Sequence, residues 1–185
     1  MKEKNKMKKQ EFKIKEVDVL KDLKGKVLNK IIYTDPVFAK VLLNFNEYNI
    51  IINNNVHEEI FTDLEEELIS YFIIDKVNND NDLDIFNGEK QYTLDINEKI
   101  TSIEVVNDLI NIDDKYEVSY DSAVILITDK HQYTISRDWF FMETMEISVD
   151  KDIDDILNKD TIIEQYKGDN NSINVSINRS INKIA

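Results

Sequence analysis

The sequence predicts an α+β fold that is mostly antiparallel β-sheet, with one or two short helices. Three observations support this prediction. β-Branched and aromatic residues gather in short runs that are bounded by Asn and Asp, a pattern typical of strands and turns. Two pairs of such runs are separated by only two or three polar residues, as in β-hairpins. The chain has only three glycines and one proline, so Asn and Asp must supply most of the turns.

The first predicted hairpin lies near the N-terminal third of the chain. Residues 27–34 form a strand that ends at Asp35-Pro36. Residues 39–45 and 48–53 then form a hairpin across the turn Asn46-Glu47.

A second predicted hairpin follows the same plan. It joins 123–128 to 132–137 across a polar turn at 129–131. Further strands are expected at 100–106, 116–120 and 142–149. Because each hairpin follows a strand and precedes an acidic stretch, the sequence suggests a pseudo-repeat of two related halves, 25–85 and 98–160. The alternative is that any two hairpins share this alternation.

Helices are predicted at two places. Thr62 and Glu65 have the spacing of a capping box, and Leu64, Leu68 and Tyr71 recur at helical spacing, which predicts a helix over 63–74. A shorter helix is expected around Ile153 and Leu157.

The domain prediction has three parts. Residues 1–15 form a flexible basic arm, and 16–167 form a single β-rich globular unit. Residues 168–185 contain a Ser-Ile-Asn repeat every four residues. This tail fits an edge strand, a marginal helix or a low-complexity segment. Disorder is favoured because one isoleucine in four buries too little surface to offset the entropy of ordering.

Charge is distributed unevenly. The first fifteen residues hold seven lysines and two glutamates, a local charge of +5, which leaves −19 on the other 170 residues because the whole chain carries −14. Phosphates are repelled by such a body, so direct nucleic-acid binding is not expected. A basic protein is the natural electrostatic partner, and solubility is the alternative role of the charge. Neither a secretory signal nor a membrane segment is visible, which predicts a cytoplasmic protein without membrane contact.

The sequence lacks the common signatures of catalysis and of cofactor or metal binding. It has no cysteine, no phosphate-binding loop and no dinucleotide fingerprint. The acidic loop that begins at Asn78 resembles a calcium loop in ligand spacing but has Leu83 where a glycine is required. His57 and His131 are expected to be exposed and unpaired. We therefore predict no catalytic residue, no cofactor and no metal.

Two segments are the candidate binding surfaces. The first is an acidic face with the residues Glu58, Glu59, Asp63, Glu65, Glu66 and Glu67. The second holds Arg137, Trp139 and Phe141, since Trp and Arg dominate the energetics of many interfaces. Burial in the core is the alternative for this second segment.

The leading hypothesis is a non-catalytic acidic binding protein. It would act as an inhibitor or immunity-type protein that blocks a basic partner, such as a nuclease toxin or a host-defence nuclease. The high content of Asn, Ile, Lys and Asp is typical of AT-rich bacterial or phage genomes, so an anti-defence role fits the same hypothesis. The alternative is a phage or bacterial structural or assembly protein. The sequence leaves the oligomeric state open.

Overall fold

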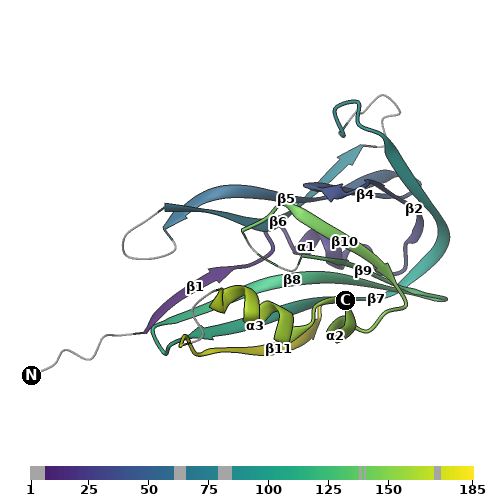
Figure 1. Ribbon diagram of the computed structural model, residues 1–185. Coiled ribbons are helices and arrows are strands. Elements are labelled where there is room, and N and C mark those ends of the chain that lie inside the picture. Colours follow the sequence, from purple (N-terminus) through teal and green to yellow (C-terminus); the bar gives the residue numbers. More distant parts are fainter. Residues whose placement is uncertain (1–6, 61–65, 79–84, 138, 140, 169–171) are drawn as a thin grey trace, which may run out of the picture.

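The computed structural model describes residues 7–60, 66–78, 85–137, 139, 141–168 and 172–185. In this part of the chain, eleven strands form one strongly bent and mostly antiparallel sheet, with three short helices (Figure 1). The predicted α+β class is confirmed. The strands are β1 (Lys8–Phe12), β2 (Val27–Thr34), β3 (Val37–Phe38), β4 (Lys40–Asn44), β5 (Tyr48–Ile60), β6 (Glu66–Asn78), β7 (Gln91–Ile112), β8 (Tyr116–Thr128), β9 (Gln132–Ser136), β10 (Thr144–Val149) and β11 (Val175–Lys183). The helices are α1 (Asp18–Lys21), α2 (Ile153–Ile156) and α3 (Lys159–Lys167).

Strand β7 bends the sheet into two layers. Its first half pairs with β2, and its second half pairs with β8 and β11. The register shifts opposite Asn29 and again near Thr101, and Asn97 between them has a positive φ of 56°. Bulges bend strands, and Asn tolerates the left-handed conformation better than most residues. The bend therefore turns β7 from an upper layer (β2, β4, β5 and β6) into a lower layer (β8, β9, β10 and β11).

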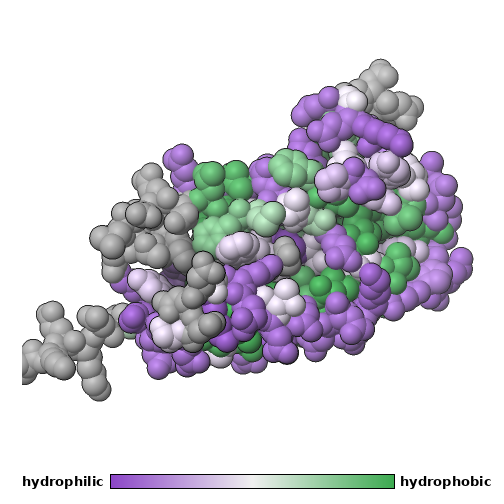
Figure 2. Space-filling view, in the orientation of Figure 1, coloured by the Kyte–Doolittle hydropathy of each residue, from purple (hydrophilic) through white to green (hydrophobic). Residues whose placement is uncertain are grey.

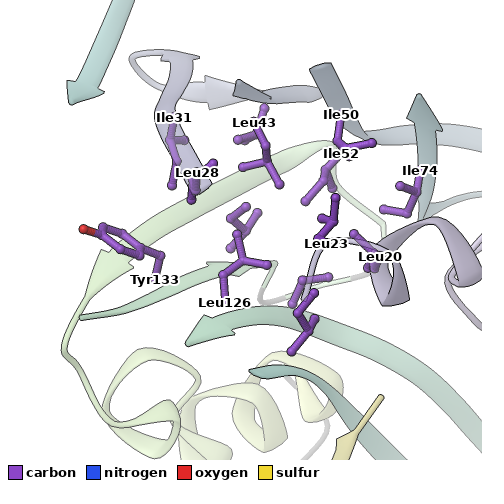
Figure 3. Packing of buried hydrophobic residues seen from close by; sticks show 14 of the residues in the cluster. Leu20, Leu23, Leu28, Ile31, Leu43, Ile50, Ile52, Ile74, Leu126 and Tyr133 are labelled. Atoms are coloured by element: carbon purple, nitrogen blue, oxygen red, sulfur yellow. The ribbon is translucent and has the colours of Figure 1, made fainter. Parts of the chain in front are cut away.

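The main core fills the space between the two layers. Leu43, Ile50 and Ile52 of the upper layer are fully buried and belong to the same cluster as Leu126 and Ile135 of the lower layer (Figure 3). Leu20 of helix α1 and Leu23, which follows the helix, belong to the same cluster, and neither has exposed surface. Burial of this aliphatic surface supplies the main driving force for folding.

Both predicted hairpins are confirmed. β4 and β5 pair antiparallel in the upper layer, and β8 and β9 pair antiparallel in the lower layer. The predicted strands at 27–34, 100–106, 116–120 and 142–149 fall within or overlap β2, β7, β8 and β10. The proposed relationship between 25–85 and 98–160 stays a prediction.

The predicted helix over 63–74 is wrong for residues 66–74, which belong to strand β6. The rest of that helix lies outside the described residues. Phe72 and Ile74 of β6 face the main core, whereas Ile69 and Tyr71 face a second core cluster with Tyr120 and Val118. A strand that is buried on both faces is apolar at nearly every position, and such a run also satisfies helical spacing.

The basic arm is also ordered from residue 8 onward. β1 pairs in parallel with β8, and Lys15 then forms a backbone bridge to β6 through hydrogen bonds with Phe72 and Ile74. Lys9 pairs with Glu117 at 2.6 Å, and Lys13 donates to Ser119 at 2.9 Å. The prediction of a flexible arm is therefore wrong for residues 8–15, because the acidic body itself attracts these lysines.

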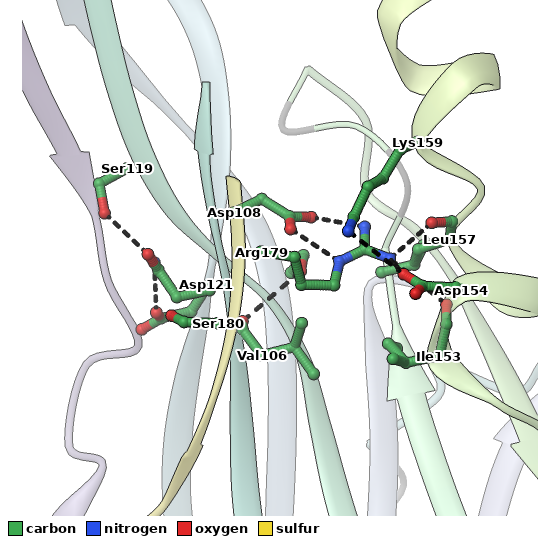
Figure 4. Close-up of polar contacts among 12 residues, drawn as sticks. Val106, Asp108, Ser119, Asp121, Ile153, Asp154, Leu157, Lys159, Arg179 and Ser180 are labelled. Atoms are coloured by element: carbon green, nitrogen blue, oxygen red, sulfur yellow. Dashed lines mark hydrogen bonds and ion pairs between the residues drawn. The ribbon is translucent and has the colours of Figure 1, made fainter. Parts of the chain in front are cut away.

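The prediction of a disordered tail is wrong for residues 175–183. These residues form β11, which pairs antiparallel with β7 over nine consecutive positions. Arg179 is the reason that the short repeat becomes ordered. Its side chain is 3% exposed and makes a bidentate ion pair with the fully buried Asp108, at 2.8 and 2.9 Å (Figure 4). The same guanidinium donates to the carbonyl of Leu157 at 2.6 Å and to Asp154 at 2.9 Å, so it also fastens α2 onto β11.

The two carboxylates around Arg179 should differ in their contribution to stability. Asp108→Asn leaves a buried guanidinium without its counter-charge and should lower the free energy of unfolding by about 3–5 kcal/mol. Asp154→Asn removes a carboxylate that is 61% exposed and should cost less than about 1 kcal/mol. Urea denaturation of both variants measures the difference, and equal losses would contradict the assignment.

Candidate functional site

The acidic residues predicted from the sequence lie at the end of a two-stranded ribbon. β4 pairs with β5 only as far as Asn53, so beyond this point β5 is paired in the sheet with β6 alone. Figure 1 shows this part of the β5–β6 hairpin extending away from the rest of the upper layer. We call residues 56–60 and 66–70 the acidic ribbon.

The register of the acidic ribbon brings four of the six predicted glutamates and aspartates together. Glu58 is exposed and lies opposite Leu68. Glu59 lies opposite Glu67, and Glu66 lies opposite Ile60. Asp63 and Glu65 lie outside the described residues. Like charges at directly opposed positions destabilise a strand pair, so this ribbon concentrates negative charge at a cost to its own stability.

An apolar residue, Leu68, lies at the position of the ribbon opposite Glu58. Leu68 is 53% exposed, one of the largest exposures of any apolar side chain described. A single apolar anchor that is surrounded by charged residues resembles the composition of a protein–protein contact, with a desolvated centre and a polar rim. On the visible face of the molecule, hydrophilic residues dominate and hydrophobic ones gather in a middle band (Figure 2).

The second predicted surface is partly interior. The side chain of Arg137 is fully buried between the layers. Its Nε and Nη2 atoms donate to the carbonyl of Asp121 at 3.2 and 3.0 Å, and its Nη1 atom donates to the carbonyl and the hydroxyl of Ser70. Nη1 also donates to Asn54, and the guanidinium lies over the ring of Phe72. Arg137 is therefore unavailable to a partner in this conformation.

Trp139 and Phe141 follow Arg137 in a connection between β9 and β10, not in a strand. Their rings meet edge to face at 5.3 Å, and Trp139 also contacts Tyr166 of α3. Both aromatic side chains are partly buried against the second core cluster. The structure thus places these two residues at the margin of a core.

Burial changes the ionisation of this cluster. Desolvation lowers the pKa of Arg137 to about 10, and the nearby Tyr120 and Asp121 oppose that shift. Burial also raises the pKa of Tyr166. Arg137 still carries its charge at neutral pH, since its pKa stays well above 7.

Sequence analysis missed a polar cluster at the turn between β8 and β9. His131 was expected to be unpaired, but its Nδ1 atom lies 2.7 Å from the carboxylate of Asp150. Glu98 is buried nearby. Its carboxylate accepts one hydrogen bond from Thr128 at 2.6 Å and another from Tyr133 at 3.3 Å. Burial and the charge of Glu98 raise the pKa of Tyr133 to about 12. The contact between His131 and Asp150 joins residues 19 positions apart in the sequence, so no local pattern predicts it.

Metal binding receives no support from the part of the chain described. Within it, no three His, Asp or Glu side chains converge as a metal site would require. Most of the acidic loop that follows Asn78 lies outside the described residues.

Comparisons with known proteins identified no related protein. No protein-family model, no curated protein and no solved structure matches this chain significantly. Among the helices described, none combines the length and the apolar character needed to span a bilayer.

Replacing Arg137 tests its role between the layers. Arg137→Met removes the hydrogen bonds that the guanidinium donates to Ser70, Asp121 and Asn54, and losing a charged donor to a buried acceptor costs about 1–3 kcal/mol. We expect a loss of roughly 2–5 kcal/mol in the free energy of unfolding, measured in urea. Arg137→Lys keeps the charge but cannot reach both carbonyls, so it should recover only part of the loss. Full recovery by lysine would contradict a bridging role.

The pKa of His131 provides a separate test. It is raised, first by the hydrogen bond with Asp150 and further by the charges of Asp150 and Glu98. Because the folded pKa is the higher one, the stabilisation is complete below the unfolded pKa of about 6.5 and is lost as pH rises through the folded value. An NMR titration of the imidazole should give a midpoint above 6.5 that falls in Asp150→Asn. An unchanged midpoint would show that the pair does not form in solution.

Proposed function

We propose that this protein acts by binding a basic protein through its acidic ribbon. The observation that carries the proposal is the pairing of β5 with β6, which sets Glu59 opposite Glu67 and places Glu58 and Glu66 at adjacent positions of the same two strands, at the end of a projecting hairpin. A cationic surface would relieve the repulsion between opposed glutamates, so binding would recover stability that the free protein lacks.

The charge of the whole chain supports the same proposal. A protein of net charge −14 attracts basic partners over long distances and accelerates their association. Three lysines of the N-terminal segment are engaged elsewhere, with Glu117, Ser119 and Tyr71. Leu68 would supply the apolar centre of the contact.

The finer form of the proposal is an inhibitor or immunity-type protein. A nuclease binds nucleic acid in a basic groove, and a narrow acidic ribbon with an apolar anchor can enter such a groove and compete with phosphates. The mode of action is steric and electrostatic, and it requires no catalytic group in this chain.

The experiment measures binding to a panel of basic bacterial nucleases. The variant Glu58→Gln/Glu59→Gln/Glu66→Gln/Glu67→Gln should associate roughly tenfold more slowly with the nuclease that is bound. Raising the salt from about 0.1 M to about 1 M should weaken wild-type binding, since the screening length falls from about 10 Å to about 3 Å. Inhibition of nuclease activity should decline in parallel.

A matched control removes four exposed carboxylates elsewhere. Asp22→Asn/Asp35→Asn/Glu47→Gln/Glu89→Gln changes the net charge by the same amount, and all four side chains are exposed. Equal losses in both variants would point to general charge attraction and contradict a specific role for the ribbon. Failure of every nuclease in the panel to bind would contradict the inhibitor proposal.

A further inference from the structure

Strand β11 has one free edge. Backbone hydrogen bonds join Asp113 to Asn174 and Ile184 to Ile103, so even-numbered residues of this segment point their backbone groups toward β7. Successive residues of an antiparallel strand direct their N–H and C=O groups to opposite edges, so the odd-numbered residues direct these groups away from β7. These are Val175, Ile177, Arg179, Ile181 and Lys183. Within the described residues, no backbone partner is found for their outward groups.

Over most of its length, this edge lacks the devices that normally prevent strands from pairing. Protective edges carry proline, a bulge or exposed charge. β11 has no proline and no register shift over nine positions, its Arg179 side chain is buried against Asp108, and its exposed charge, Lys183, lies at its last position. Two other edges are partly covered: Lys15 and Arg137 bond to β6, and β3 pairs with β10.

The sequence of β11 complements itself in the antiparallel direction. A twofold axis at Arg179 sets Ile177 opposite Ile181 of a second copy, and Ser176 opposite Asn182. On the same face as that second pair, Asn178 meets Ser180. On the face of the odd-numbered residues, Ile177 meets Ile181 on both sides of the axis, Val175 meets Lys183, and the two Arg179 side chains lie at the axis, each paired with its own Asp108. On the other face, amide groups meet hydroxyls, and both these and the Ile177–Ile181 contacts are favourable cross-strand pairs.

We propose that two copies of this chain form a dimer by pairing β11 with β11 around this axis. The inference is independent of the proposed partner binding, because the acidic ribbon belongs to the other layer. The dimer would extend the lower layer into one continuous sheet across two chains. It would also cover Ile181, which is 49% exposed in the single chain.

Electrostatics select this edge over others for self-association. Residues 172–185 contain no Asp or Glu, and their charged residues are Arg179 and Lys183. Two bodies of charge −14 repel one another, and this uncharged to basic segment is where they can approach. Salt should therefore strengthen the dimer, whereas it should weaken binding of a basic partner.

Sedimentation equilibrium of the full chain tests the proposal. We expect the mass to rise with concentration from 21.8 kDa toward twice that value, more readily at high salt. Ile181→Pro removes an outward N–H without touching the hydrogen bonds to β7, so it should abolish the rise. Ile181→Val keeps the N–H and should retain it. Circular dichroism and melting temperature confirm that both variants are folded.

Cysteine cross-linking tests the register, since the natural chain has no cysteine. Asn178→Cys and Ser180→Cys chains should form a disulfide-linked dimer when they are mixed and oxidised, and much less when either is oxidised alone. Cross-linking of either variant with itself to the same extent would overturn the axis at Arg179. A wild-type chain that stays monomeric at millimolar concentration, or an Ile181→Pro variant that still dimerises, would overturn the proposal.

Discussion

The buried guanidinium of Arg137 is the interaction on which the two-layer structure depends. β6 and β8 lie in different layers and are not paired by a strand ladder. Arg137 joins them by donating to the carbonyls of Ser70 and Asp121, and the rings of Phe72 and Tyr120 flank its charge. Burying a cation is costly, but the planar set of donors of this guanidinium bonds carbonyl groups of both strands at once. A lysine, with one nitrogen, could not span the gap.

Strand pairing depends on the same interaction. Without Arg137, the edge of β6 would expose backbone groups to the core. At the next positions along this edge, the backbone of Lys15 forms hydrogen bonds with Phe72 and Ile74. Covering that edge lets β6 be apolar on both faces, with Phe72 in the main core and Tyr71 in the second. The second core can then accept Trp139 and Phe141 from the segment that follows Arg137.

Local patterns predicted the hairpins well because turn residues and alternation act over a few positions. They failed for β6, whose two buried faces remove the alternation, and for β11, whose order rests on an ion pair between residues 71 positions apart. The acidic site was predictable from composition, but its placement on a ribbon depended on that same strand. Arg137 was selected from the sequence because Arg and Trp dominate the energetics of many interfaces. Whether its side chain is buried or exposed depends on the carbonyls of Ser70 and Asp121, which are distant in the sequence and which no sequence pattern specifies.

The placement of charge also decides which edges stay open. Glutamates crowd the acidic ribbon, whose strands project beyond the layer, and their repulsion discourages pairing with a second identical ribbon. Lys9 and Lys13 of the N-terminal segment are held by Glu117 and Ser119, where they lie along β8. At β11, Asp108 withdraws the charge of Arg179 into the interior and leaves an almost neutral edge. One buried ion pair thus orders the strand and also removes the charge that would keep other strands away from it.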